Sequence, residues 1–343
     1  MKMNLYNELG YLNYDAIEAA APGSWCYVII GARQVGKTYG ALKRVLDKDI
    51  KHILLRRTNE EVLFIGANET LNPYNVFSPE YDIRLKQTKK ILEVWNYKSE
   101  EEKSFNGLIM GLPTVSHIRG FNGSAYTDII FDEFIPEKHV IVRKTEGDAL
   151  LNAYTTINGN RELNGAPPLK IWLLSNSNRI DSPILEALNL TDPVLKMRDK
   201  KRELMTLDSG ITIIQPFSKG IIRQRTQTAL LKHLEGDKNA FYKMAVENEF
   251  AYDDSSRVKV LNMKYFRPLC SIGELYFYDN NDNQTIYCCR IPHKKARFES
   301  TPFYIKKFIK EWNYIFDWYR AEWLYFADLR LLTLFRTYFD IDF

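Results

Sequence analysis

The sequence predicts an α/β fold built on a parallel sheet, followed by a smaller α+β part. From residue 1 to 215, short apolar runs alternate with helical patterns, as they do in chains made of βαβ units. After Pro216 the alternation stops, and residues 221–244 are polar, basic and helical in pattern. Beyond Asn262, two β-rich runs flank a cluster of turn-forming residues, which predicts a hairpin.

The length and composition support a chain of more than one domain. A length of 343 residues exceeds what one hydrophobic core usually holds, since domains average about 100–200 residues. We expect an α/β domain at 1–215, a helical linker at 216–261 and a C-terminal domain at 262–343. The hydrophobic fraction of 45% excludes a mostly disordered chain. No apolar run matches a membrane helix and the first residues lack a signal-peptide pattern, so we expect no membrane partner.

The expected strands are short apolar, β-branched runs bounded by polar or glycine-containing segments. Buried strands of the α/β domain are expected at 25–30, 52–55, 128–131, 170–174 and 211–214. A helix at 39–46 is expected after the first of them, and a meander at 91–95 and 108–110 is expected to extend the sheet. The C-terminal hairpin strands are expected at 274–278 and 285–289, before an aromatic, helical end at 302–343.

The cysteines and the net charge say little about function. The cysteines lack the spacing of zinc ligands, so we expect reduced thiols at Cys26, Cys270, Cys288 and Cys289. A net charge of +4 permits a polyanionic partner but does not require one.

The strongest motif is a phosphate-binding loop between the first strand and the first helix. It matches the pattern G-x-x-x-x-G-K-[ST] at every required position, as Gly31-Ala32-Arg33-Gln34-Val35-Gly36-Lys37-Thr38. The glycines let backbone N–H groups approach phosphate oxygens, and the helix that follows directs its positive end at them. Lys37 is expected at the β- and γ-phosphates of ATP, and Thr38 at the Mg²⁺ ion. A strand before the loop and a helix after it are the context that this mechanism needs.

An acidic pair ends the strand at 128–131. Because ligands of α/β sheets bind at the carboxyl ends of the strands, Asp132 and Glu133 are expected to lie near the loop. Asp132 is expected to hold magnesium, and Glu133 to act as the base for an attacking water. A glutamate in that position favours hydrolysis over phosphate transfer to a substrate that brings its own nucleophile.

The polar pair Ser175-Asn176 ends the strand at 170–174. Its side chains are expected to contact the γ-phosphate and to change their contacts when that phosphate is lost. A turn stabilised by local hydrogen bonds explains the same pair equally well. Arginines near these segments are candidates for the positive group that hydrolysis of a nucleoside triphosphate needs, and each is also consistent with an ordinary ion pair. They are Arg33, Arg56, Arg57, Arg119 and Arg161.

Taken together, these residues resemble the DNA-packaging ATPases of tailed bacteriophages, the large-terminase family, in the branch of the phi-twenty-nine-like encapsidation proteins of small podoviruses. The resemblance lies in the order and spacing of segments that span most of residues 25–180. These segments are 28–39, 55–57, 118–134, 160–162 and 173–176.

The resemblance implies a P-loop NTPase domain of the additional-strand, catalytic-glutamate type. It implies an ATP-hydrolysing, homomeric ring of five subunits that docks on the capsid portal and moves double-stranded DNA. Such a ring would act in the cytoplasm of the infected bacterium, transiently on the procapsid, and a packaging RNA is a further candidate partner. Arg119 matches a basic residue that acts across the subunit interface. The family's trans-acting arginine is expected at Gly159, and Arg161, two residues later, is our choice for it.

The C-terminal domain would correspond to the family's RNase H-like nuclease, but without its chemistry. The strand at 275–278 has Tyr and Phe where a mid-strand aspartate is needed, and Asp279 and Asp282 are expected in the turn. We therefore expect no nuclease activity, and a docking or DNA-contacting role instead.

Three alternative functions remain open from the residues alone. A helicase or another ring-forming translocase would share the loop and the acidic pair. A P-loop kinase for a nucleoside or other small molecule would transfer phosphate instead of releasing it. A nucleotide-binding assembly protein would bind ATP without turnover.

Overall fold

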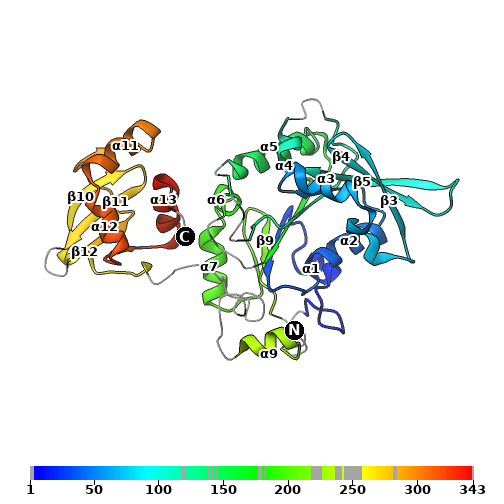
Figure 1. The fold of residues 1–343 in the computed structure, drawn as a ribbon, viewed down its shortest axis with the longest axis horizontal. Helices are drawn as coiled ribbons and strands as arrows, with labels where there is room; N and C mark the ends of the chain where they lie inside the picture. The colour runs from blue at the N-terminus through cyan, green and yellow to red at the C-terminus, as the bar shows by residue number, and fades with distance from the viewer. Residues whose placement is uncertain are drawn as a thin grey trace. The chain divides into compact units, whose positions relative to one another are not determined.

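The computed structural model describes residues 4–117, 121–137, 140, 142–143, 145–176, 180, 182–217, 226–235, 242, 257–280 and 284–341. The chain divides into two compact units, Met1–Ala251 and Tyr252–Phe343 (Figure 1). This division falls inside the stretch 216–261 predicted as a linker. Most of the predicted helical segment at 221–244 lies outside the described residues, which include the helix α9 (Ala229–Glu235) and Tyr242.

Unit 1 is built on a nine-stranded sheet of order β3-β4-β5-β2-β6-β7-β1-β9-β8 within the described residues. Six neighbouring strands, from β5 to β9 in this order, are parallel, and antiparallel strands extend both edges. The strands are β1 (Cys26–Gly31), β2 (His52–Arg56), β3 (Asp82–Thr88), β4 (Ile91–Tyr97), β5 (Lys103–Gly111), β6 (Asp128–Asp132), β7 (Lys170–Asn176), β8 (Leu204–Thr206) and β9 (Ile211–Ile214).

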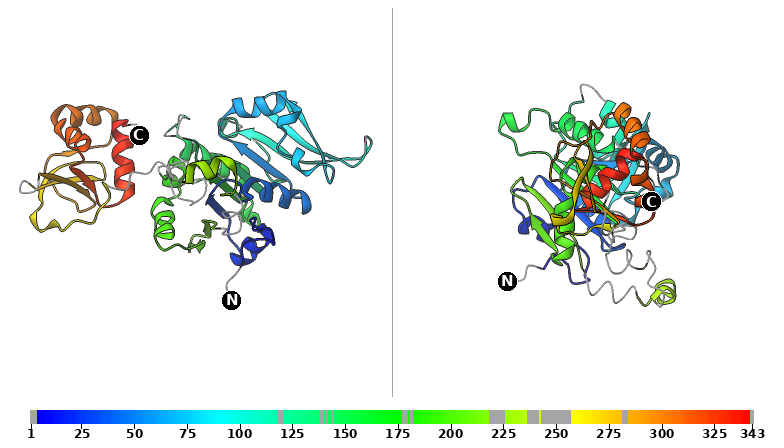
Figure 2. Two further views of the ribbon diagram at one scale, coloured as in Figure 1. Left: turned by 60° about the horizontal axis from the view of Figure 1, so that its bottom comes forward. Right: turned by 90° about the vertical axis from the view of Figure 1, so that its left-hand side faces the viewer.

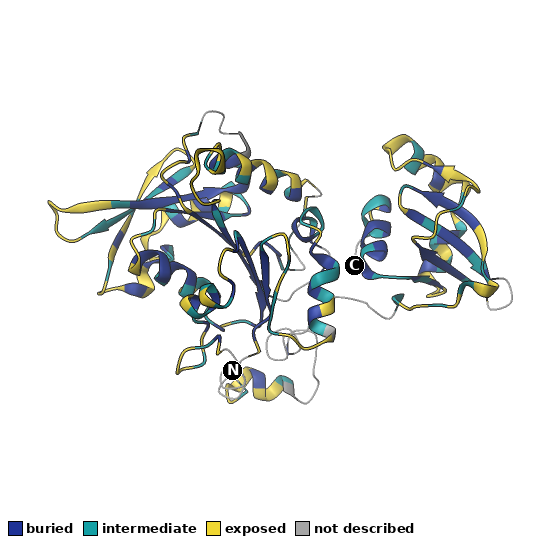
Figure 3. Cartoon of the chain, turned by 180° about the vertical axis from the view of Figure 1, so that it is seen from behind, coloured by how far each residue is buried: buried dark blue, intermediate teal, exposed yellow. Residues whose placement is uncertain are grey.

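Both faces of the central strands are buried, as the dark strands of Figure 3 show. One face packs against α1, α2 and α3 through alternate residues such as Tyr27, Ile29 and Trp172. The intervening residues, Val28 and Ile30 among them, are equally buried. Continuous apolar runs are therefore found in these strands, as expected for a parallel sheet covered on both sides.

The helices of unit 1 connect the strands and carry the loops at the carboxyl edge of the sheet. Those described are α1 (Tyr14–Ala20), α2 (Lys37–Asp47), α3 (Asn59–Ala67), α4 (Leu112–His117), α5 (Glu146–Asn158), α6 (Pro183–Ala187), α7 (Thr191–Asp199) and α9. Short 3-10 turns lie at Glu69–Leu71, Asn75–Phe77 and Glu162–Asn164. No helix in the described part of the chain is both long and apolar enough to cross a bilayer.

The predicted α/β architecture is confirmed. Every strand predicted in the first domain is present, and α2 follows β1 as expected. The bounds agree within two residues except for β5, which begins at Lys103, five residues before the predicted start at 108. β7 lies between β1 and β6, so one additional strand separates the strand of the phosphate loop from the strand of the acidic pair. The meander has a third strand, β3, that the sequence did not reveal, because its exposed face is charged and only Ile83 is fully buried.

Within its described residues, unit 2 contains a five-stranded sheet of order β13-β10-β11-β12-β14 and an aromatic core. Its strands are β10 (Arg267–Ile272), β11 (Leu275–Asn280), β12 (Thr285–Cys289), β13 (Arg297–Phe298) and β14 (Leu324–Phe326). Its helices are α11 (Pro302–Glu311), α12 (Tyr314–Arg320) and α13 (Leu329–Phe339), with a 3-10 turn at Met263–Tyr265. The predicted hairpin is confirmed by antiparallel pairing of β11 with β12.

Two details of the sequence prediction for unit 2 are wrong. Asp279 lies inside β11, where it pairs with Ile286 across the hairpin, because the strand continues two residues beyond the apolar run. Leu324–Phe326 forms the edge strand β14 within the stretch predicted to be helical, since it pairs in parallel with β12. Asp282 lies outside the described residues.

Candidate nucleotide site

The segment between β1 and α2 forms a tight loop whose backbone requires glycine at one position. Gly36, the residue before α2, has a φ of 86°, in the left-handed region that glycine adopts without strain. A Cβ atom built on it would also lie 3.2 Å from Cβ of Tyr11. The loop thus brings the backbone N–H groups at the start of α2 to the carboxyl edge of the sheet, where such groups can bind an anion.

Lys37 is held inside the loop. Its ammonium donates to the carbonyl oxygens of Gly31 at 3.0 Å and Ala32 at 2.7 Å. It also donates to Oδ1 of Asn176, at the end of β7, at 3.0 Å. The structure therefore brings together two separately predicted pieces, the loop lysine and the Ser-Asn pair.

Thr38 and Asp132 lie next to each other. The hydroxyl of Thr38 donates to Oδ1 of Asp132 at 2.8 Å, and Nη1 of Arg56 donates to the other carboxylate oxygen at 2.9 Å. Asp132 is 8% exposed. A hydroxyl and a carboxylate in contact are the hard oxygen ligands that Mg²⁺ prefers, so the donor set fits the ion.

Glu133 is exposed and sits at a strained turn. Its φ is 57°, which is uncommon for a residue other than glycine and is often found at functional sites. The next residues are tied to β7: the N–H of Phe134 donates to the carbonyl of Leu174 at 3.3 Å, and the Ser175 hydroxyl donates to the carbonyl of Ile135 at 3.0 Å. The turn thus leaves the Glu133 side chain at the sheet edge beside Asp132.

Glu61, which the sequence analysis did not single out, also belongs to this site. Its carboxylate lies 3.8 Å from Nε of Arg56. Burial raises the pKa of Glu61 and the nearby Glu133 carboxylate adds to the rise, against the opposing effects of Arg56 and Thr58. Thr58 caps α3 by accepting the N–H of Glu61 at 3.2 Å. The capping pattern Thr-x-x-Glu, directly after two arginines, is the signal that could have revealed it.

The other candidate arginines have different surroundings. Arg57 pairs with Glu146 in the first turn of α5 at 2.6 Å, and Arg33 pairs with Glu137. Arg161 donates to the backbone carbonyls of Ser124, at 3.1 Å, and of Tyr126, just before β6 begins. It therefore lies at the amino end of β6, whereas Asp132 lies at the carboxyl end. Arg119 lies outside the described residues.

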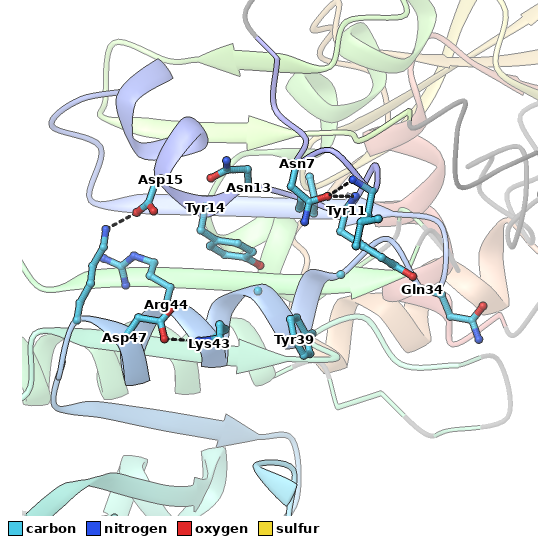
Figure 4. Close-up of a pocket in the computed structure, with 15 residues that line it drawn as sticks. Asn7, Tyr11, Asn13, Tyr14, Asp15, Gln34, Tyr39, Lys43, Arg44 and Asp47 are labelled. Carbon is cyan, nitrogen blue, oxygen red and sulfur yellow. Dashed lines mark hydrogen bonds and ion pairs between the residues drawn. The ribbon is translucent and has the colours of Figure 1, made fainter. Parts of the chain in front are cut away.

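A cavity of about 890 Å³ opens beside the loop. Gln34, Gly36 and Tyr39 begin one wall, which continues along α2 to Lys48, and residues of the N-terminal segment 7–15 contribute the other (Figure 4). Tyr14 borders this cavity and donates its hydroxyl to the carbonyl of Lys37 at 2.5 Å. Burial raises the pKa of Tyr14 well above its ordinary value, so the hydroxyl remains a donor to the start of α2.

The amino edge of the same sheet holds a second group of charges. Arg44 pairs with Asp128 and with Glu18, both at 2.7 Å, and Lys170 also donates to Glu18. The indole N–H of Trp172 donates to Asp128 at 3.1 Å. Burial alone would raise the pKa of Glu18, but the hydrogen bonds from Arg44 and Lys170 lower it to about 2. Arg44 and Asp128 are buried and Glu18 and Lys170 are partly buried, and the positive and negative charges of the group balance.

The four cysteines are free, as expected. All four are also buried, and burial raises the pKa of each thiol. Among the described residues, no group of three or more His, Cys, Asp or Glu side chains is arranged to hold a metal ion.

The sequence profile of one protein family covers most of the chain. The podovirus DNA encapsidation protein (Gp16) family matches residues 11–264. The chain belongs to this family. The resemblance inferred from residues 25–180 is thereby confirmed.

Individual relatives are distant but agree with the family. A "DNA packaging protein" of Bacillus phage B103 is 28% identical over 237 residues, which are 66% of this chain and 64% of that protein. The match thus spans slightly less than two thirds of that relative's length.

Two solved structures share the fold of this family member. A chain of the bacteriophage Phi-29 viral genome packaging motor assembly has a TM-score of 0.64 and 17% identity, covering 96% of this chain and 99% of that one. A chain of the Phi-28 gp11 DNA packaging motor has a TM-score of 0.59 and 16% identity, with coverages of 95% and 98%. The likeness extends over both units.

Proposed function

We propose that the chain is the ATP-hydrolysing subunit of a motor that moves double-stranded DNA into a preformed viral capsid. The observation that carries the proposal is the convergence of Lys37, Thr38 and Asp132 at one sheet edge, with Glu133 beside them. This is the constellation that hydrolysis of a nucleoside triphosphate requires, in a member of a family named for DNA encapsidation.

ATP and Mg²⁺ fit the residues at this edge. Lys37 would exchange its backbone carbonyl partners for the β- and γ-phosphates, and Thr38 and Asp132 would hold the ion. A bound Mg²⁺ neutralises charge on the phosphate oxygens. The cavity walled by Gln34 and Tyr39 has room for the base and ribose, since ligand pockets typically measure about 300–1,000 Å³.

Glu133 is proposed as the base that takes a proton from the attacking water. Its exposed carboxylate follows the magnesium ligand Asp132 directly, so a water between it and the γ-phosphate is within reach of both. Asn176 is proposed to respond to loss of the γ-phosphate, because it shares the Lys37 ammonium that the phosphate would attract. Ser175 would support it by holding the turn after β6.

Arg161 and Arg119 are proposed to act on the nucleotide of a neighbouring subunit. In its own chain, Arg161 lies at the amino end of β6, whereas the nucleotide site lies at the carboxyl end of the same sheet. A role in catalysis therefore requires the site of another copy, as in a homomeric ring. We propose a ring of five subunits on the capsid portal, held there by the portal or by a packaging RNA, in the cytoplasm of the infected bacterium.

Unit 2 is proposed to serve as a docking or DNA-contacting module with no nuclease activity. The hairpin strand β11 carries aromatic side chains at its centre, and Asp279 lies near its end. Metal-dependent cleavage of plasmid DNA by the purified chain would contradict this proposal.

The test of the proposed function is phosphate release from ATP, with and without double-stranded DNA, across a series of protein concentrations. We expect stimulation by the duplex and a steep dependence on concentration, since each site would be completed by a neighbour. Turnover that is independent of both would contradict a ring translocase. Transfer of phosphate to a nucleoside would establish a kinase instead, and unwinding of a forked duplex a helicase.

A further inference from the structure

Strands β3 and β4 form an antiparallel hairpin at one end of the strand order of unit 1. They belong to the light-blue and cyan end of the sheet in Figure 1 and in the left view of Figure 2. Ile91, at the start of β4, pairs with Met110 near the end of β5, and β5 runs parallel to β2. The turn at Lys89 and Lys90 therefore lies at the carboxyl edge of the sheet, the edge that also carries the nucleotide site.

The charges of this hairpin are separated along its length. Between Ile83 and Leu92 the sequence has four cations and no carboxylate. Acidic side chains gather at the opposite end, where Arg84 pairs with both Asp82 and Glu100 at 2.8 Å. We call the exposed residues Lys86, Lys89 and Lys90 the basic tip.

The basic tip has no carboxylate partner among the described residues. None of its three lysines forms an ion pair there, and all three are exposed. The nearest acidic residue across the hairpin, Glu93, faces Lys86 in the register but accepts from the Thr88 hydroxyl and the Trp95 indole instead. Three positive charges are thus presented together to solvent, where a polyanion can reach them.

The turn holds a lysine where the backbone favours other residues. Lys89 has a φ of 57°, a conformation that Gly, Asn and Asp adopt most readily in two-residue hairpin turns. Side chains below the tip are buried against the rest of unit 1, Leu92 and Val94 among them. A Cβ built on Gly66 of α3 would lie 2.6 Å from Leu92, so helix and hairpin approach closely. The tip is therefore a turn supported by α3, and it keeps its charge at an unfavourable backbone position.

We propose that the basic tip contacts the phosphate backbone of the double-stranded DNA that the motor moves. This inference rests on the proposed function, which supplies the duplex. Lysines are point charges that pair with phosphates without reading bases, and such sequence-independent contacts suit a motor that must bind every part of a genome. The basic tip lies on the nucleotide edge, with β5, β2, β6 and β7 between β4 and β1, so it is able to contact a second molecule without covering the ATP site.

The experiment measures binding of the full-length protein to a short fluorescent duplex, by anisotropy, over a range of salt concentrations and with a non-hydrolysable ATP analogue. The test variant is Lys86→Gln, Lys89→Gln, Lys90→Gln in one chain. Loss of three phosphate contacts is expected to weaken binding at least tenfold at about 50 mM salt. The slope of log affinity against log salt should become shallower by about 2–3.

A matched control removes the same charge from the opposite edge of the same sheet. Lys51→Gln, Lys98→Gln, Lys103→Gln changes three exposed lysines near the amino ends of β2 and β5, and is expected to leave affinity and slope at wild-type values. Lys86→Arg, Lys89→Arg, Lys90→Arg retains the charge and is expected to bind as the wild type does.

Three results would overturn the proposal. Wild-type affinity and salt slope in the tip variant, beside normal wild-type binding, would overturn the tip contact alone. Unchanged DNA binding with lost attachment to purified procapsids would assign the tip to a capsid protein or an RNA. Failure of the wild-type chain itself to bind any duplex would overturn the proposed function together with the tip contact.

Discussion

One strand, β6, begins and ends with an aspartate, and the two lie in contrasting surroundings. At the amino edge Asp128 is enclosed by Arg44 and Trp172, with side-chain exposures of 4% for Asp128 and 5% for Arg44. At the carboxyl edge Asp132 contacts Thr38 and Arg56, beside the exposed Glu133. Both edges are rich in charge, and both use the same kinds of side chain.

The difference lies in whether the charges need a ligand. The amino-edge group satisfies itself with buried ion pairs that hold α1, α2 and the sheet together. At the carboxyl edge the Lys37 ammonium donates to backbone carbonyls, and the strained Glu133 is exposed to solvent. A polyphosphate and a metal ion can take the place of these backbone and solvent contacts. Substitutions at the carboxyl edge should therefore change turnover, and those at the amino edge should change stability.

The largest effect is expected from Lys37→Ala. Removing the ammonium deletes the charge that the β- and γ-phosphates require, so steady-state phosphate release should fall to background and binding of a fluorescent ATP analogue should weaken. Lys51→Ala, an exposed lysine at the amino edge, serves as the control and should retain turnover. A Lys37→Ala protein with normal turnover would show that the loop is not the catalytic nucleotide site.

Glu133→Gln should separate binding from chemistry. A general base contributes roughly 10²–10⁴-fold, so phosphate release should fall by that factor while the affinity for the ATP analogue stays near wild type. Glu60→Gln removes another exposed carboxylate close to the same edge and should have no such effect. Wild-type turnover in Glu133→Gln would mean that another group activates the water, with Glu61 the first to test.

Arg44→Met should have the opposite profile. It leaves the buried Asp128 without its cation and the partly buried Glu18 without one of its three cations. Breaking a buried pair typically lowers the free energy of unfolding by about 3–5 kcal/mol. Urea unfolding should detect the loss, whereas turnover per folded molecule should remain similar. Lys48→Met, which removes a more exposed partner of the same Glu18, should lower stability by less than about 1 kcal/mol. Equal losses in the two variants would contradict the assignment of the buried network.

A smaller, pH-dependent effect is expected from His52, at the start of β2. Burial lowers the pKa of His52 to about 4, whereas the unfolded side chain titrates near about 6.5. Between these values the unfolded chain binds a proton that the folded chain does not. The contribution of His52 to the free energy of unfolding is therefore fully present above about pH 6.5 and is lost as the pH falls towards 4.

The free energy of unfolding should decline by at most about 3 kcal/mol over this pH range. His52→Gln cannot titrate but can still bond to the Tyr74 hydroxyl that His52 contacts at 2.6 Å, so its stability should vary less over this range. Hydrogen exchange of peptides from β1 and β2 at several pH values would measure the difference. Identical pH profiles for the two proteins would exclude His52 as the source.

The sequence was sufficient where a pattern and its strand context agree. Lys37 and Asp132 could be placed at one sheet edge because each follows an apolar run, and the carboxyl ends of parallel strands meet. Asn176 could be found by the same reasoning, and the structure adds its contact with the Lys37 ammonium.

Side chains that act through tertiary contacts could not be predicted in this way. The contact of Arg56 with Asp132 joins residues that are far apart in the chain, and nothing in the local pattern distinguishes Arg56 from Arg57, which turns to Glu146 instead. The amino-edge network was missed for the same reason, because Glu18 and Asp128 look like ordinary surface carboxylates in the sequence. Strand β3 was missed because its alternation is half charged.

The additional strand β7 fixes the width of the nucleotide site. With one strand between β1 and β6, Lys37 and Asp132 start from strands two spacings apart, or about 9–10 Å. This separation is set by the hydrogen-bond ladders of the backbone, which do not depend on side-chain identity. The dimension of the cleft can thus be inherited unchanged while most residues around it are replaced. That property gives a simple reason why chains only 17% identical retain one fold.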